Sequence, residues 1–166
     1  MQLPHTLKRW NVFADGDSWA GQAEEIELPK LTKKTEEHRG AGMITPAPVI
    51  LGYEKMELTI TTGGLIPSAV KQFSKCEDVM LRFAGAYQRD DNCDVLAGEI
   101  IVRGKFVEWE PGTAKEGDKN TPKLMMHLHY YKMMIDGETI LTVDAYNPVV
   151  GPEESGSNAI RSAIGL

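Results

Sequence analysis

Hydrophobic and polar side chains alternate with a period of two along much of the chain, the pattern of a β-strand with one buried face. The clearest example is MELTIT from Met56 to Thr61, where the apolar side chains would face one way and the glutamate and threonines the other. Residues 79–87 repeat this alternation, and residues 95–109 form a longer strand-like run. Within that run, Gly98 and Gly104 are expected to mark bulges or a close backbone approach.

Two Asp-Gly pairs predict tight hairpins, because this dipeptide is favoured in type I′ turns. Asp136-Gly137 separates a strand-like run at Lys123–Ile135 from a second run that extends to residue 147. Asp15-Gly16 lies between two shorter runs near the start of the chain. These pairs predict antiparallel β-structure.

Helical signals are few. Pro67 opens a short segment through Lys75, where its missing N–H costs nothing in a first turn, and Val70 and Phe73 would face inward. Near the end of the chain, Asn158 is expected to cap a last helical turn.

Two stretches, residues 30–48 and 110–122, show no period and contain several glycines and prolines. We predict long loops there, which in compact domains usually have a binding or assembly role. A chain of 166 residues fits one domain. The predicted fold of residues 1–166 is therefore mainly β, an antiparallel sandwich or barrel-like subunit with one short flanking helix.

Such a fold leaves strand edges open, and open edges pair with other chains unless they are covered. A closed ring of subunits, with strands pairing across the interfaces, would cover them.

The net charge of the chain limits which partners it can bind. The 18 Lys and Arg residues are outnumbered by 24 Asp and Glu, for a net charge of −6. Tight nucleic-acid binding is excluded, because it needs a basic surface that neutralises phosphates. The sequence also predicts no transmembrane helix or signal peptide, and hence no membrane anchor.

No motif in the sequence predicts catalysis. Asp90, Asn92 and Asp94 have the opening spacing of a calcium loop, but the required glycine and glutamate are missing, which favours an acidic turn. His127 and His129 could reach one metal ion from one strand face, but no third ligand completes a site. We therefore predict no catalytic residue, metal or cofactor, and expect a role in assembly.

Several distinctive blocks cover almost the whole chain. They are LPKLTKKTEEHRGAGM from Leu28 to Met43, PVILG from Pro48 to Gly52, RFAGAYQRDD from Arg82 to Asp91, Tyr130-Tyr131-Lys132 with Asp136-Gly137, and Ile164-Gly165-Leu166 at the end. In these blocks the sequence resembles the major tail tube proteins of contractile-tailed bacteriophages, the family shared with R-type pyocin tubes.

The resemblance implies hexameric rings that stack into a hollow tube, with four strands from each subunit forming a continuous inner β-barrel. The tube would lie inside a contractile sheath and conduct DNA into the host as cargo that is not tightly bound. The implied partners are other copies of the chain and the tail sheath, initiator or baseplate, tape measure and terminator proteins. The chain would be made in the host bacterial cytoplasm and end in the virion tail.

The resemblance also suggests which residues act. The loop that would reach a neighbouring subunit or the next ring contains Leu28, Pro29, Lys30, Leu31, Arg39, Gly40, Gly42 and Met43. The period-two pattern would turn one polar face of the strands toward the bore, and its candidate positions are Glu57, Thr59, Thr61, Thr142 and Asp144.

A second hypothesis remains open at this point. The chain could be a standalone β-sandwich binding module that uses residues 30–48 and 110–122 as recognition loops. Deletion of residues 31–42 separates the two hypotheses, because it would stop stacking in a tube subunit and change only ligand affinity in a binding module.

Overall fold

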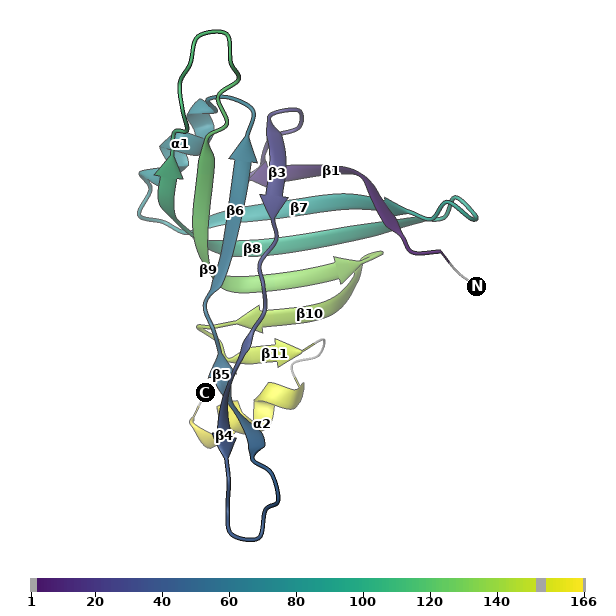
Figure 1. The fold of residues 1–166 in the computed structure, drawn as a ribbon, viewed down its shortest axis with the longest axis vertical. Helices are drawn as coiled ribbons and strands as arrows, with labels where there is room; N and C mark the ends of the chain where they lie inside the picture. Colours follow the sequence, from purple (N-terminus) through teal and green to yellow (C-terminus); the bar gives the residue numbers. More distant parts are fainter. Residues whose placement is uncertain (1–2, 152–154, 166) are drawn as a thin grey trace.

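The computed structural model describes residues 3–151 and 155–165, and it is dominated by β-strands (Figure 1). The strands are β1 (Thr6–Ala14), β2 (Asp17–Ser18), β3 (Ala23–Glu27), β4 (Lys33–His38), β5 (Ala47–Tyr53), β6 (Met56–Thr62), β7 (Val79–Gln88), β8 (Val95–Glu110), β9 (Lys123–Ile135), β10 (Glu138–Asp144) and β11 (Val149–Gly151). The helices are α1 (Pro67–Phe73) and α2 (Ser155–Ala163). The expected antiparallel, mainly β fold is confirmed.

Apart from β4 and β5, which form a sheet of their own, the strands form two layers that share β8 and β9. The broad layer has the order β11-β10-β9-β8-β7-β1-β2 and uses residues 95–103 of β8 and 130–135 of β9. The narrow layer has the order β3-β6-β9-β8 and uses residues 123–128 of β9 and 104–110 of β8. In Figure 1 the strands of the narrow layer run along the vertical axis, whereas those of the broad layer cross them.

The two layers meet at a corner that is built by one glycine and one bulge. The register of β8 and β9 jumps from Arg103 opposite Tyr130 to Gly104 opposite Leu128, which leaves His129 as the extra residue. A bulge bends the strand that contains it. A Cβ atom on Gly104 would lie 2.0 Å from the carbonyl oxygen of His127. The expectation that Gly104 marks a bulge and a close backbone approach is confirmed.

Gly98 has a different surrounding. It stays in regular register opposite Gly85, and a Cβ atom there would lie 2.8 Å from the Tyr87 ring. What comes close to Gly98 is therefore an aromatic side chain, with no bulge.

The hydrophobic core lies between the layers. Leu58 and Ile60 of β6 and Met126 of β9 face Leu81 of β7 and Val102 of β8, and each of these side chains is at most 2% exposed. The burial of β6 alternates at every position from Met56 to Thr62. The predicted strand at 56–61 is confirmed, and so are those at 79–87 and 95–109.

The predicted Asp-Gly turns are also confirmed. Asp136 and Gly137 have φ values of 49° and 83°, and Asp15 and Gly16 have 47° and 93°. These positive values are what a type I′ turn requires at both central residues. The Asp136 carboxylate also accepts a hydrogen bond of 2.9 Å from the backbone N–H of Ala97, which ties this turn to β8.

The helices differ from expectation in two ways. Helix α1 buries Ala69 and Gln72, not Val70 and Phe73, and Phe73 is 39% exposed. Because Ile66 is buried directly before the helix, the inward face follows a spacing of three from that residue. The structure also has a second helix, α2, which begins at Ser155, so that Asn158 lies inside it and does not cap it.

The prediction of a loop at 30–48 is wrong, because this range contains β4 and the start of β5. All residues of β4 are exposed, so no alternation of apolar and polar residues reveals the strand in the sequence. Residues 111–122, in contrast, lie between β8 and β9 without helix or strand, as predicted.

Candidate functional site

The arm, which we define as residues 33–53, extends from the body of the subunit (Figure 1). Its strands β4 and β5 pair from Lys33 opposite Tyr53 to His38 opposite Ala47 and form a sheet of their own. Isolated two-stranded hairpins are at best marginally stable in water. Ile44 at the tip is 93% exposed, and Ile50 and Leu51 are more than half exposed. An exposed apolar surface of this kind marks an interaction site.

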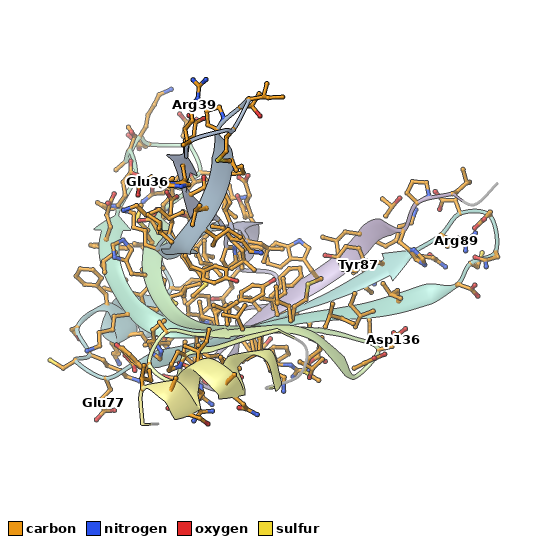
Figure 2. All side chains as sticks on the ribbon, turned by 90° about the horizontal axis from the view of Figure 1, so that it is seen from below. Glu36, Arg39, Glu77, Tyr87, Arg89 and Asp136 are labelled. Carbon is orange, nitrogen blue, oxygen red and sulfur yellow. The ribbon has the colours of Figure 1, made fainter. Side chains whose placement is uncertain are left out.

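The tip of the arm, residues 39–46, is closed by a turn. The Met43 N–H donates a hydrogen bond of 3.3 Å to the Gly40 carbonyl oxygen, and the Gly40 N–H donates one of 3.2 Å to the Met43 sulfur. Gly42 has a φ of 86°, which favours glycine. Figure 2 shows Glu36 and Arg39 on the arm, apart from the side chains that fill the space between the layers. The tip is therefore a formed turn presented away from the core.

The residues predicted for the inter-subunit loop fall into two groups. Leu28, Pro29, Lys30 and Leu31 connect β3 to β4 at the base of the arm, whereas Arg39, Gly40, Gly42 and Met43 lie at its tip. The six residues of β4 separate the groups, which is about 20 Å at 3.3 Å per residue. The structure does not bring the two groups together within one subunit.

The outer face of the narrow layer is acidic. Directly opposed residues of β3, β6, β9 and β8 form three cross-strand rows on this face. The rows are Glu27-Thr59-Met125-Glu108, Glu25-Thr61-Lys123-Glu110 and Glu57-His127-Lys105. Five glutamates thus share this face with two lysines.

Four of those glutamates, two on β3 and two on β8, were not predicted as site residues. A signal for them exists in the sequence. AEEIE at 23–27 and VEWE at 107–110 both place a glutamate on either side of an apolar residue, which is the same period of two that identified Glu57, Thr59 and Thr61.

Within the described chain, Glu57 is the glutamate of this face that forms ion pairs. Its Oε1 atom lies 2.6 Å from Lys55 Nζ and 3.0 Å from His127 Nε2. The hydrogen bond from Lys55, with a smaller contribution from His127, lowers the pKa of Glu57 below its ordinary value. The carboxylate is therefore held in its charged form.

Thr142 and Asp144 lie in the other layer. They alternate on β10 with the buried Val143, which places them on the outer face of the broad layer. Burial tends to raise the pKa of Asp144, but hydrogen bonds from Asn147 and Tyr146 outweigh it, and the pKa is lowered. The structure therefore separates Thr142 and Asp144 from the Glu57 group.

A groove lies where the arm joins the body of the subunit. It has a volume of about 620 Å³. Its lining comes from the base of the arm (Leu31, Tyr53), from β9 (Leu128), from β10 (Val143) and from α2 (Ile160). Most of the lining is apolar. The sequence contained no signal for the groove, because its residues come from segments that lie far apart in the chain.

The two histidines take separate partners on either side of the bulge. His127 contacts Glu57, whereas His129 Nε2 lies 2.9 Å from Asp78 Oδ2 and its ring stacks on Tyr146. Across residues 3–151 and 155–165, no three His, Cys, Asp or Glu side chains are grouped to hold a metal ion. None of the described helices is long and apolar enough to cross a membrane.

Comparison with protein families gives one match over nearly the whole chain. The model of the family described as phage tail tube protein FII matches residues 4–165. The tail tube protein of Escherichia phage P2 is 36% identical over 154 residues, which are 90% of each chain. The major tail tube protein of Serratia phage KSP20 is 28% identical over 172 residues, which cover 100% of this chain and 99% of the relative.

Comparison with solved structures gives the same architecture. A chain in the extended sheath-tube complex of the extracellular contractile injection system PVC is 11% identical, with a TM-score of 0.60 over 79% of this chain and 91% of that chain. A chain in the baseplate of the anti-feeding prophage is 12% identical, with a TM-score of 0.57 over 81% and 97%. At this identity the likeness shows the fold alone.

Proposed function

The chain belongs to the phage tail tube protein FII family, and we propose that it builds a hexameric ring whose bore is lined by the narrow layer. Its function is that of a structural subunit of the phage tail tube. In the proposal, residues 1–166 act as one domain, rings stack into a hollow tube inside a contractile sheath, and the chain performs no catalysis.

The edges of the narrow layer support its place in a continuous barrel. It has four strands, the number expected from each subunit. Strand β3 pairs only with β6, and β8 beyond Gly104 pairs only with β9. Both edges of this layer are therefore open within the described chain. Pairing of the β3 edge of one subunit with the β8 edge of the next would close a barrel and remove both edges.

The acidic outer face is the observation that carries the assignment of the bore. Each contact between a cation and a phosphate adds affinity for DNA. A surface without an excess of lysine and arginine therefore binds DNA weakly and lets it slide. Repeated around a ring and along a stack, five glutamates per subunit would repel DNA within about 8 Å at physiological salt. In this arrangement Glu57, Thr59 and Thr61 line the bore, whereas Thr142 and Asp144 lie away from it.

The arm is the proposed contact to another copy. It continues the direction of β3 and β6 beyond the body of the subunit (Figure 1). If the strands of the narrow layer follow the tube wall, the arm extends toward the adjacent ring. Its two groups of predicted residues, at the base and at the tip, would then meet across copies.

The proposed partners follow from the same role. The matched solved structures come from a sheath-tube complex, a sheath and tube terminator and a baseplate. For this chain we propose contacts with a sheath protein, an initiator or baseplate protein, a terminator and a tape measure protein, with DNA as the cargo. The site of synthesis in this proposal is the host cytoplasm.

Electron microscopy of the purified protein tests the function. We expect rings or tubes, alone or with tail initiator proteins, and strictly monomeric protein under both conditions would contradict the proposal.

A shortened variant tests the arm. Thr35 and Ile50 are paired neighbours, so an Asn-Gly turn can replace residues 36–49. This variant should keep the circular dichroism and unfolding transition of the parent but form no stacks. Normal stacks would remove the arm from the interface.

A further inference from the structure

Among the residues that the structure describes, the groove at the base of the arm is an open, mostly apolar surface. Its volume of about 620 Å³ is in the range of roughly 300–1,000 Å³ that specific binding pockets have. Apolar side chains from the arm base, the corner and α2 line it. Ile160 of α2 is still 64% exposed and Tyr53 is 45% exposed, so an occupant would bury apolar surface that the isolated subunit leaves in water.

The tip of the arm has the chemistry that fits this groove. Residues 39–46, RGAGMITP, contain one arginine, no acidic residue and the apolar pair Met43 and Ile44. Ile44 has almost no contact within its own subunit, since it is 93% exposed. The tip therefore presents an exposed apolar side chain and an exposed positive charge.

The charges around the groove complement those of the tip. Glu54 and Asp144 line the groove together with one cation, Lys55. Lys55 is already engaged by Glu57 at 2.6 Å. Asp144 is held by the Asn147 and Tyr146 hydrogen bonds. Glu54 is exposed and makes no ion pair in the described chain, so it is the carboxylate left to meet Arg39.

The tip cannot fill the groove of its own subunit. Strand β4 extends from the base to the tip over six residues, about 20 Å, and the tip lies at the far end of the molecule from the layers (Figure 1). An occupant with the chemistry of the tip must therefore come from a second copy. A contact between two different surfaces of identical chains repeats head to tail, as stacking requires.

We propose that the arm tip of one copy inserts Ile44 into the groove at the arm base of another copy, with Arg39 against Glu54. This inference rests on the proposed tube assembly and names the surface that receives the arm. Leu31 and Tyr53 at the arm base would then have two roles. They support the arm of their own subunit, and they line the groove that binds the arm tip of another copy.

Disulfide trapping in assembled tubes tests the contact. Cys76 and Cys93 are exposed, so the parent carries Cys76→Ser and Cys93→Ser. Ile44→Cys combined with Ile160→Cys should give a ladder of linked multimers after oxidation. The matched control combines Ile44→Cys with Leu65→Cys, which is equally exposed at 65% but lies beside α1, and it should give no ladder. Absence of the ladder in tubes, or equal ladders in both variants, overturns the proposal.

Charge reversal gives a second readout that does not depend on thiols. Arg39→Glu and Glu54→Arg should each raise the critical concentration for tube formation about tenfold, equivalent to about 1.4 kcal/mol. The double variant should return it close to the parent value. A double variant no better than either single variant contradicts the Arg39–Glu54 contact.

The two proposals fail in different ways. If the parent forms no rings or tubes, the proposed function itself is wrong. If it forms normal tubes but the Ile44–Ile160 link is absent, only the receptor assignment is wrong. A link from Ile44→Cys to a co-assembled sheath subunit and not to Ile160→Cys would assign the tip to the sheath and also overturn the inference.

Discussion

The two layers of the sandwich share β8 and β9 and face the same core, but their outer faces differ in charge. The narrow layer presents five glutamates and two lysines. The broad layer presents Arg9, Arg82, Arg103 and Lys132 with Glu99 and Asp144. The inner faces of the two layers therefore form the core of the fold. In the proposed tube, the charge of the outer faces would distinguish the layer that lines the bore from the layer that faces away from it.

The layers also differ in how their charges are balanced. On the broad layer the Arg82 guanidinium contacts the Glu99 carboxylate at 2.8 Å and lies over the Phe13 ring, and Arg103 lies over Tyr130. On the narrow layer Glu57 is paired with Lys55 and His127, but no ion pair of Glu25 or Glu27 is found within the described chain. Charges that are balanced locally produce little field at a distance, and unbalanced charges of one sign add up.

The largest loss of folding stability is expected at Gly104, because both layers depend on the corner that it forms. Gly104→Val should prevent folding, because a Cβ atom would lie 2.0 Å from a backbone oxygen of β9. We expect a loss of more than about 4 kcal/mol, which few single substitutions cause. The soluble yield and the urea unfolding curve measure it. Lys105→Ala, at the next and exposed position, is the control and should fold; a well-folded Gly104→Val variant would contradict the corner.

Truncation of the core should affect both layers equally. Leu58→Ala in the narrow layer and Leu81→Ala in the broad layer each remove a side chain that is at most 2% exposed. Each should lower the free energy of unfolding by about 2–5 kcal/mol. Urea denaturation measures both. A loss at one position alone would mean that the two inner faces do not form one core.

Most of the body of the subunit is predictable from sequence, because burial on one face imposes a period of two and tight turns impose Asp-Gly. Met56–Thr62, the 123–135 run and both Asp-Gly turns are of this kind. The arm is not predictable in the same way. Its strand pairing is set by the backbone of β4 and β5, and with both faces of β4 exposed its side chains carry no burial pattern.

The candidate site was predictable only in part. The alternation in β6 identified Glu57, Thr59 and Thr61 as an outer face, but the same rule selected Thr142 and Asp144 on β10. A period of two reports that a residue points away from the core; it does not report which layer contains the strand. That information comes from the register across β3, β6, β9 and β8, and from the corner at Gly104.

Charge reversal on the narrow layer tests its place in the bore. The double variant Glu25→Lys and Glu27→Lys should assemble normally but slow DNA ejection several-fold, because lysines facing the bore would contact phosphates. Glu116→Lys with Asp118→Lys, in the exposed 111–122 segment, changes the net charge equally and should leave ejection unchanged. Real-time DNA release from purified particles measures both. Equal rates in the two variants would remove the narrow layer from the bore.

The smallest expected change in stability comes from loss of the Arg82–Glu99 ion pair on the broad layer. Arg82, by its hydrogen bond and charge, lowers the pKa of Glu99 below the ordinary 4.5. The unfolded chain therefore binds this proton more tightly, so the pair stabilises the fold above pH 4.5 and the contribution is lost as the pH falls through the folded pKa. Glu99→Gln should cost about 0.2–1 kcal/mol at pH 7, since both side chains are partly exposed, and less at pH 3. Thermal unfolding at both pH values measures the difference, and Glu25→Gln, without an ion partner in the described chain, should cost less at pH 7. An equal cost of Glu99→Gln at both pH values would show that the layers do not differ in charge balance at this pair.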